Sequence, residues 1–147
     1  MKLRQLSLFL ENRPGALRLP CQVLGAAGID ILTMSLADTQ QFGILRLIVK
    51  EEERAKRVLE EAGCVVSLTE VLAVGVPNRP AGLGEVLEAF DQAGLSIEYM
   101  YPFAAGHRGH TAVLVFRFEN PDRAAEHLRA RGVKIFSRDE VFAQAGI

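Results

Sequence analysis

The feature that most constrains the fold of this chain is an internal repeat. The segment ENRPGAL at residues 11–17 recurs as PNRPAGL at residues 77–83, 66 residues further along. Other identities keep the same offset, among them Leu6 and Leu72, Ile31 and Ile97, and Met34 and Met100. Self-similarity of this kind indicates two copies of one structural unit. We therefore predict two domains, residues 1–70 and 71–147, packed together because no Gly/Ser/Pro-rich linker separates them.

The later part of each copy repeats at a slightly larger offset. Identical residues there lie 69 positions apart, as in the pairs Leu45 and Leu114, Arg54 and Arg123, Leu59 and Leu128, and Gly63 and Gly132. The second copy therefore holds three additional residues, which we place near residues 104–109.

Both copies show the same order of predicted strands and helices. Every second residue is apolar in residues 6–10 and 72–76, which predicts a strand in each copy. The Asn-Arg-Pro turn that follows predicts a helix start with Asn as its N-cap, and Gly28 and Gly94 are expected as helix C-caps. The remaining predicted elements are strands from residues 29 and 95, at 42–49 and 111–118, and at 64–68 and 133–136, with second helices after residues 51 and 120.

This order is βαββαβ, twice. Right-handed crossovers make each copy a ferredoxin-like α+β unit, a four-stranded antiparallel sheet with two helices on one face. The other face of each sheet is then bare. We expect the two sheets to be packed together, or extended edge to edge, because either arrangement covers exposed sheet surface.

Composition excludes several classes of function. The 17 Lys and Arg residues nearly balance 18 Asp and Glu, so a net charge of −1 gives no reason to expect nucleic acid or a membrane surface as partner. The strands at 42–49 and 111–118 lack the basic-glycine-aromatic pattern of RNA-recognition modules. No apolar run approaches the ~20 residues of a membrane span, and no signal peptide is recognisable. We expect a soluble, cytoplasmic protein.

Residues that could carry catalysis or bind a metal are sparse. Cys21 and Cys64 are isolated, with neither zinc-site spacing nor a neighbouring His. His107 and His110 are too few for a stable metal site, which needs three or four converging ligands. No nucleophile–base pair, paired carboxylates or phosphate-binding loop is recognisable. We therefore expect no metal, no cofactor and no enzymatic activity.

The strand, the ENRPGAL turn, a helix ending in AAG and the following IDI together resemble the ACT domain, an amino-acid-binding regulatory module. The sequence of these segments is especially similar to that of the regulatory domain of phosphoglycerate dehydrogenase. The resemblance covers nearly the whole chain as two ACT domains. It implies a binding site between the first loop and helix of one domain and the second strand of a partner domain.

The resemblance also implies which residues bind the ligand. They are Asn12, Arg13, Gly15, Ala16, Asp30 and Ile31 in the first copy, and Asn78, Ala81, Gly82, Ser96 and Ile97 in the second. A helix N-terminus offers N–H donors to an α-carboxylate, and an Asn carbonyl or the Asp30 carboxylate can accept from an α-ammonium group. The plainer alternatives are that both Asn residues only cap helices, that Arg13 faces solvent, and that Asp30 is an ordinary strand-start residue.

Two departures from the family pattern distinguish the copies. The second copy reads Ala81-Gly82 where the first reads Gly15-Ala16, and Pro20 is expected inside the first helix, where it would remove a hydrogen bond and kink the chain. We therefore do not assume that both copies bind equally.

The resulting functional hypothesis is a non-enzymatic sensor that binds a small amino acid and acts on a partner, such as an enzyme, in trans. We expect a homodimer because one face of each sheet is uncovered and because the resemblance to ACT domains implies dimerisation. The alternative is an ACT-fold protein-interaction subunit that binds no ligand, and a third, weaker possibility is a small enzyme of the ferredoxin-like class.

Overall fold

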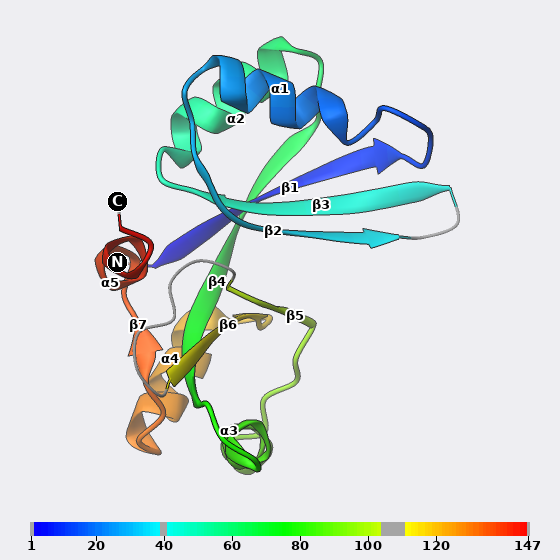
Figure 1. Cartoon of the computed structure of the whole chain (residues 1–147). Helices are drawn as coiled ribbons and strands as arrows, with labels where there is room; N and C mark the ends of the chain where they lie inside the picture. The colour runs from blue at the N-terminus through cyan, green and yellow to red at the C-terminus, as the bar shows by residue number, and fades with distance from the viewer. Residues whose placement is uncertain (1, 39–40, 104–110, 147) are drawn as a thin grey trace. The chain divides into compact units, whose positions relative to one another are not determined.

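The computed structural model describes residues 2–38, 41–103 and 111–146. The chain divides into two compact units (Figure 1), a first unit of residues 4–69 and a second unit of residues 1–3 with 70–147. The three additional residues predicted near 104–109, together with His107 and His110, lie outside the described residues.

The first unit is an antiparallel sheet with two helices on one face (Figure 1). Its strands are β1 (Leu3–Glu11), β2 (Ile31–Asp38), β3 (Phe42–Val49) and the beginning of β4 (Val66–Pro77), in the order β2–β3–β1–β4. The helices are α1 (Arg18–Ala26) and α2 (Glu52–Glu61). This is the predicted βαββαβ order.

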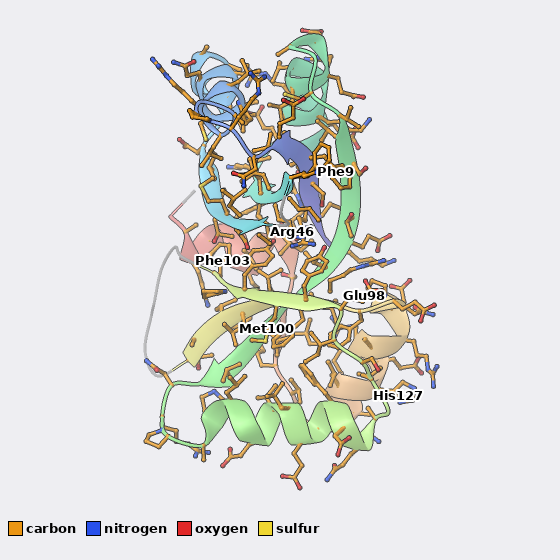
Figure 2. The ribbon with its side chains drawn as sticks, turned by 90° about the vertical axis from the view of Figure 1, so that its right-hand side faces the viewer. Phe9, Arg46, Glu98, Met100, Phe103 and His127 are labelled. Atoms are coloured by element: carbon orange, nitrogen blue, oxygen red, sulfur yellow. The ribbon has the colours of Figure 1, made fainter. Side chains whose placement is uncertain are left out.

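Strand alternation explains how the first unit builds its core. Leu6 pairs with Leu47 and Leu8 with Leu45, so the same face of both strands carries leucine. Those residues are fully buried and pack with residues of the two helices, Leu24, Ala55 and Leu59. The opposite face carries Phe9, whose side chain projects from β1 (Figure 2) and is 62% exposed.

The second unit repeats the plan of the first. Its strands are the later part of β4, β5 (Tyr99–Pro102), β6 (Thr111–Arg117) and β7 (Ile135–Phe136), in the order β7–β4–β6–β5. Its helices are α3 (Gly82–Gln92), α4 (Pro121–Ala130) and α5 (Arg138–Gln144). The strand order is the one found in the first unit, as a repeat requires. The predicted fold class, two βαββαβ units with antiparallel sheets, is therefore confirmed.

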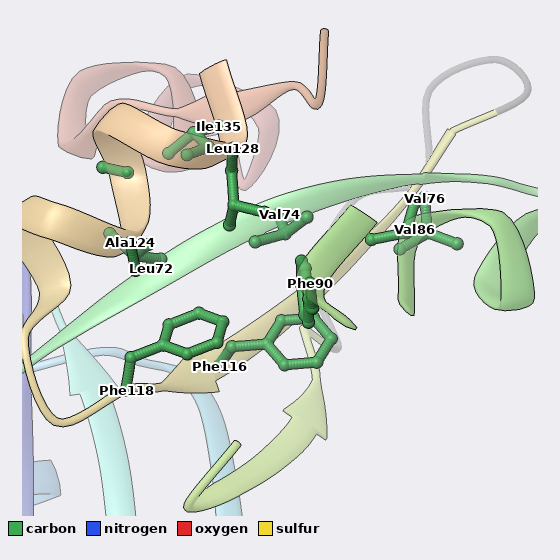
Figure 3. Close-up of a cluster of buried hydrophobic side chains, with 11 residues drawn as sticks. Leu72, Val74, Val76, Val86, Phe90, Phe116, Phe118, Ala124, Leu128 and Ile135 are labelled. Atoms are coloured by element: carbon green, nitrogen blue, oxygen red, sulfur yellow. The ribbon is translucent and has the colours of Figure 1, made fainter. Parts of the chain in front are cut away.

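Aromatic packing distinguishes the second core. The ring of Phe90 on α3 meets Phe116 and Phe118 edge to face, with centroids 4.9 and 5.2 Å apart (Figure 3). All three side chains are buried among the aliphatic residues of β4 and α4. Edge-to-face contacts of this kind add to the stabilisation that burial alone provides.

Several local predictions are confirmed. Gly28 and Gly94 follow α1 and α3 with φ of +70° and +68°, the left-handed conformation that a C-cap glycine supplies. The Asn120 side chain accepts a hydrogen bond from the Arg123 N–H at 3.1 Å and caps α4, with Pro121 at the first helical position.

Three features differ from the sequence predictions. The strands predicted at 64–68 and 72–76 form one strand, β4. The residues between them, Thr69, Glu70 and Val71, include no glycine or proline that would end a strand. The strand predicted from residue 95 begins only at Tyr99. Helix α5 was not predicted, although Ser137 and Glu140 form the capping box that would have indicated it.

Candidate functional site

The first candidate site is the loop between β1 and α1, residues 11–17, which we call the first NRP loop. Arg13 N–H donates to the Glu11 carbonyl at 2.9 Å, and Ala16 N–H donates to the Arg13 carbonyl at 3.2 Å. Gly15 has a φ of +85°, which a glycine adopts without strain. The Asn12 N–H donates to the Gln41 carbonyl at 2.9 Å, which ties the loop to the chain just before β3.

The Asn12 side chain does not cap a helix, so that part of the prediction is wrong. Helix α1 begins at Arg18, and its N-cap is Leu17, which offers no side-chain acceptor. Asn12 is exposed, and within the described part of the chain its amide makes no hydrogen bond. Both its carbonyl and its NH₂ group are therefore available to another molecule.

A cavity of about 160 Å³ opens beside this loop. Its apolar lining comes from three leucines and a glycine on different elements, and its polar lining comes from the loop itself. The lining residues are Leu10, Glu11, Asn12, Arg13, Ala16, Leu17, Leu36 and Gly43. Arg13 and Glu11 form an ion pair at 2.9 Å at the surface, where both side chains are mostly exposed.

Pro20 removes no helical hydrogen bond from α1, contrary to prediction. The helix begins at Arg18, so Pro20 lies in its first turn, where the missing N–H would have had no helical acceptor. A helix beginning two residues earlier would have set the Pro20 ring against the carbonyl of Ala16. Pro20 therefore accounts for the late start of α1.

The second candidate site is the corresponding loop between β4 and α3, residues 77–83, which we call the second NRP loop. Arg79 N–H donates to the Pro77 carbonyl at 2.9 Å, and Gly82 N–H donates to the Arg79 carbonyl at 3.0 Å, as in the first loop. Ala81 has a φ of +70°, the left-handed conformation of Gly15. Asn78 is exposed and is not the N-cap, since α3 is capped at Ala81.

The second NRP loop is closed more tightly than the first. Helix α3 begins at Gly82, the counterpart of Ala16, and so starts two residues earlier than α1. A Cβ on Gly82 would overlap the carbonyl oxygen of Pro77, so only glycine fits there. Arg79 forms an ion pair at 2.6 Å with Glu85 on α3, which links the loop to the helix.

The residues predicted at the start of the second strand lie far from the NRP loop of their own unit. Ile31 pairs with Val49, at one end of β3, whereas Glu11 pairs with Phe42 at the other end. Asp30 is exposed just before β2. The structure thus brings together Asn12, Arg13 and Ala16 around one cavity but leaves Asp30 and Ile31 at the opposite end of the strands.

In the second unit, Ser96 and Ile97 precede β5 and belong to no strand. Ser96 lines a small hollow of about 140 Å³ with Phe118, Asn120 and Arg123, near the start of α4. Asn78, Ala81 and Gly82 share the second NRP loop instead. The predicted residues of this unit are therefore also divided between two places.

Sequence reasoning missed the apolar residues of the cavity. Leu10, Leu17, Leu36 and Gly43 come from β1, the loop, β2 and β3, and no spacing in the sequence marks them as a group. One signal was present, because Leu36 is an apolar residue near the end of a strand at the edge of the sheet.

A second hollow, of about 360 Å³, also borders the first NRP loop and shares Leu10, Glu11, Arg13 and Ala16 with the first cavity; Gly15, Leu19 and Cys64 are among its other lining residues. Burial raises the pKa of the Cys64 thiol above its ordinary value of 9.0. The thiol is therefore protonated at neutral pH, which makes it a poor nucleophile.

No group of three or more His, Cys, Asp and Glu side chains within 2–38, 41–103 and 111–146 could hold a metal ion. No helix in the same ranges is long and apolar enough to cross a membrane.

Several solved structures are similar to this chain. Protein BT0572 from Bacteroides thetaiotaomicron is 34% identical, with a TM-score of 0.87, and the match covers 97% of this chain and 96% of that one. The regulatory subunit of aspartate kinase from Thermus thermophilus, in its ligand-free form, is 19% identical with a TM-score of 0.65, covering 90% and 92%. The Thermus flavus regulatory subunit of aspartate kinase is 16% identical with a TM-score of 0.61, covering 88% and 92%.

Among curated protein sequences, none matches this chain. The family profile described as an ACT domain pair matches residues 1–143. With its two βαββαβ units and paired NRP loops, the chain belongs to the ACT domain pair family and resembles the aspartate kinase regulatory subunits in fold.

Proposed function

We propose that this protein is an amino-acid sensor that binds its ligand at the first NRP loop and acts on a partner in trans. The observation that carries the proposal is the Asn12 amide, which has no partner in the described residues and lies at a cavity with an aliphatic lining. A polar group at the edge of an apolar hollow suits a small molecule with one charged end and one apolar end.

The chemistry of an α-amino acid fits the groups around Asn12. The amide carbonyl can accept from an α-ammonium group, and the amide NH₂ can donate to an α-carboxylate. The guanidinium of Arg13 is held only by an exposed ion pair with Glu11, which is a weak interaction. Arg13 is therefore free to exchange Glu11 for a ligand carboxylate.

We also propose that the working form is a homodimer whose second copy completes the site. Strand β2 has β3 as its neighbour, and Met34 and Leu36 on it are 39% and 51% exposed. Antiparallel pairing of β2 with β2 of a second chain would set Asp30 of the partner subunit beside Leu36, near the cavity. Within one chain, Asp30 lies too far from Asn12 to contact the same ligand. In the paired arrangement, Asp30 of the partner subunit would accept a hydrogen bond from the ligand's ammonium group.

Regulation would follow from this geometry. A ligand held by two chains binds the paired state better than the separated state, and it shifts the population accordingly. We propose that the partner is an enzyme on a separate chain, whose activity this protein regulates. Membership of the ACT domain pair family supports a regulatory role.

Thermal-shift screening of the twenty amino acids tests the proposal. A ligand at 100 times its Kd stabilises by about 2.7 kcal/mol, which raises the Tm of a domain of this size by roughly 5–10 °C. The double variant Asn12→Ala with Asn78→Ala should fold normally and lose the shift. If no amino acid at millimolar concentration raises the Tm, the protein is better described as a ligand-free interaction subunit.

A further inference from the structure

We infer that the two NRP loops are not equivalent, and that only the first binds an amino acid, one with a short or branched aliphatic side chain. The inference rests on the proposed function and goes beyond it in two ways. It assigns one site per chain, and it assigns the chemical class of the ligand side chain.

The lining of the first cavity selects for an apolar group. Leu10, Leu17 and Leu36 supply aliphatic surface, and Gly43 completes the apolar part. The charged lining residues, Glu11 and Arg13, are paired with each other. A charged ligand side chain placed against the three leucines would lose its hydration there, and aliphatic groups cannot replace it.

The size of the cavity suits a small ligand side chain. A volume of about 160 Å³ is similar to the engineered apolar cavity of about 150 Å³ that binds benzene. The side chains of valine, leucine and isoleucine have fewer carbon atoms than benzene and fit in such a space. Each methylene buried there should tighten binding about fourfold.

Gly43 keeps the first cavity open. A Cβ at this position would lie 3.2 Å from the Leu36 Cδ1, so a larger residue would push Leu36 into the space. Gly43 pairs with Leu10 on β1. The corresponding pair in the second unit is Val76 with Ala112, which places a methyl group where the first unit has none.

The second NRP loop packs closely against the start of its own helix. Gly82 lies so close to the Pro77 carbonyl that no side-chain atom fits between them. The earlier start of α3 and the 2.6 Å pair between Arg79 and Glu85 close the loop against its helix. A hollow of about 560 Å³ borders Pro77 and Glu85, but the described residues that line it do not include Asn78, whereas Asn12 lines the first cavity.

Isothermal titration calorimetry of the full chain tests both parts. We expect L-leucine, L-isoleucine or L-valine to bind at one molecule per chain, about tenfold or more tightly than L-alanine, and L-lysine and L-aspartate to bind more weakly still. Asn12→Ala should weaken binding at least tenfold. Its matched control, Asn78→Ala, should leave affinity and stoichiometry unchanged.

A second variant pair tests selectivity separately from folding. Leu36→Ala should reduce the ratio of leucine to alanine affinity several-fold, because part of the apolar lining is gone. Leu83→Ala, which shortens a leucine of the second NRP loop that is 38% exposed, should leave that ratio unchanged. A merely structural effect of Leu36 would weaken both ligands alike and leave the ratio constant, and that result would overturn the selectivity.

The outcomes separate this inference from the function on which it rests. Two molecules per chain, or loss of binding in Asn78→Ala, would overturn the single site while leaving the sensor intact. Preferred binding of a polar or charged amino acid would overturn the aliphatic class alone. Absence of binding by every amino acid would overturn the proposed function and this inference together.

Discussion

The two NRP loops are made from almost the same residues and differ in shape. Both place their fifth residue, Gly15 or Ala81, in the left-handed conformation, with φ of +85° and +70°. In the first loop the glycine occupies that left-handed position, whereas in the second loop the glycine comes one residue later, where it lies against the Pro77 carbonyl. The two loops thus differ in which of two adjacent positions holds the glycine.

The helices that follow reinforce the difference. Pro20 delays the start of α1 to Arg18, and the residues between Gly15 and Arg18 remain as a loop beside the cavity. Val86 occupies the equivalent position of α3 and imposes no such delay, so α3 begins at Gly82. The shape of each NRP loop therefore depends on the residues of the helix that follows it, Pro20 in α1 and Val86 in α3, as well as on the residues of the loop.

The largest effect is expected from a methyl group at the point of closure. Gly82→Ala should lower the free energy of unfolding by about 2–3 kcal/mol, because the new Cβ overlaps a backbone carbonyl that cannot move freely. The matched variant Ala16→Gly in the first loop should change it by less than about 1 kcal/mol. Urea denaturation of both variants measures this. Equal effects would show that the two loops close alike.

The next effect concerns the left-handed position. Ala81→Gly should stabilise the protein by about 1 kcal/mol, since glycine adopts a positive φ without the penalty that alanine carries. Gly15→Ala should destabilise it by a similar amount, although a Cβ there would meet no other atom. The two variants are compared by thermal unfolding, and shifts of the same sign would refute this account.

A further difference lies at the starts of α2 and α4. Asn120 caps α4 through its side chain, whereas Glu51 at the equivalent position makes no cap hydrogen bond. Asn120→Ala should therefore cost about 1 kcal/mol, whereas Glu51→Ala should cost clearly less. Chemical denaturation gives both values. A cost for Glu51→Ala as large as that for Asn120→Ala would contradict the assignment of the cap.

The smallest effect is a pH dependence in the second unit, where α5 has a capping box. The hydrogen bond from Lys134 and that from the Ser137 N–H hold the pKa of Glu140 below its ordinary value of 4.5. A carboxylate with a lower pKa in the folded state stabilises it above pH 4.5, and this contribution is lost as the pH falls through the folded pKa. Glu140 is exposed, so solvent screening limits the effect to about a few tenths of a kcal/mol.

Glu140→Gln isolates that contribution. The variant should lose less stability than the parent protein between pH 7 and pH 3, as measured by urea midpoints at both values. An identical acid response in the two proteins would mean that the capping box carries no charge-dependent stabilisation.

Predictions that depend on neighbouring residues were confirmed. The strand at Phe42–Val49, the glycines at positions 28 and 94, and the Asn120 cap each follow from a pattern within a few residues. Asn12 was different, because Leu17 and not Asn12 became the N-cap of α1. The capping signal placed the turn correctly but not the residue at which the helix begins.

The candidate site could be predicted only in part. The NRP loop was visible as a repeated motif, and Asn12, Arg13 and Ala16 do meet at one cavity. Leu36 and Gly43 could not be assigned to it, since they reach the loop only through the pairing of β2, β3 and β1. Asp30 was expected near the ligand, and the same register places it at the opposite end of the strands from the NRP loop.

The repeat, the order of its elements and the near-neutral charge were determined by the sequence alone, because each depends on local periodicity and on comparing one half of the chain with the other. The tertiary structure decided that the strands at the junction are one strand, that the first loop opens on a cavity, and that the second is closed against Pro77. These outcomes depend on contacts between residues that are far apart in the sequence. Similar short motifs adopt different conformations when the atoms packed around them differ.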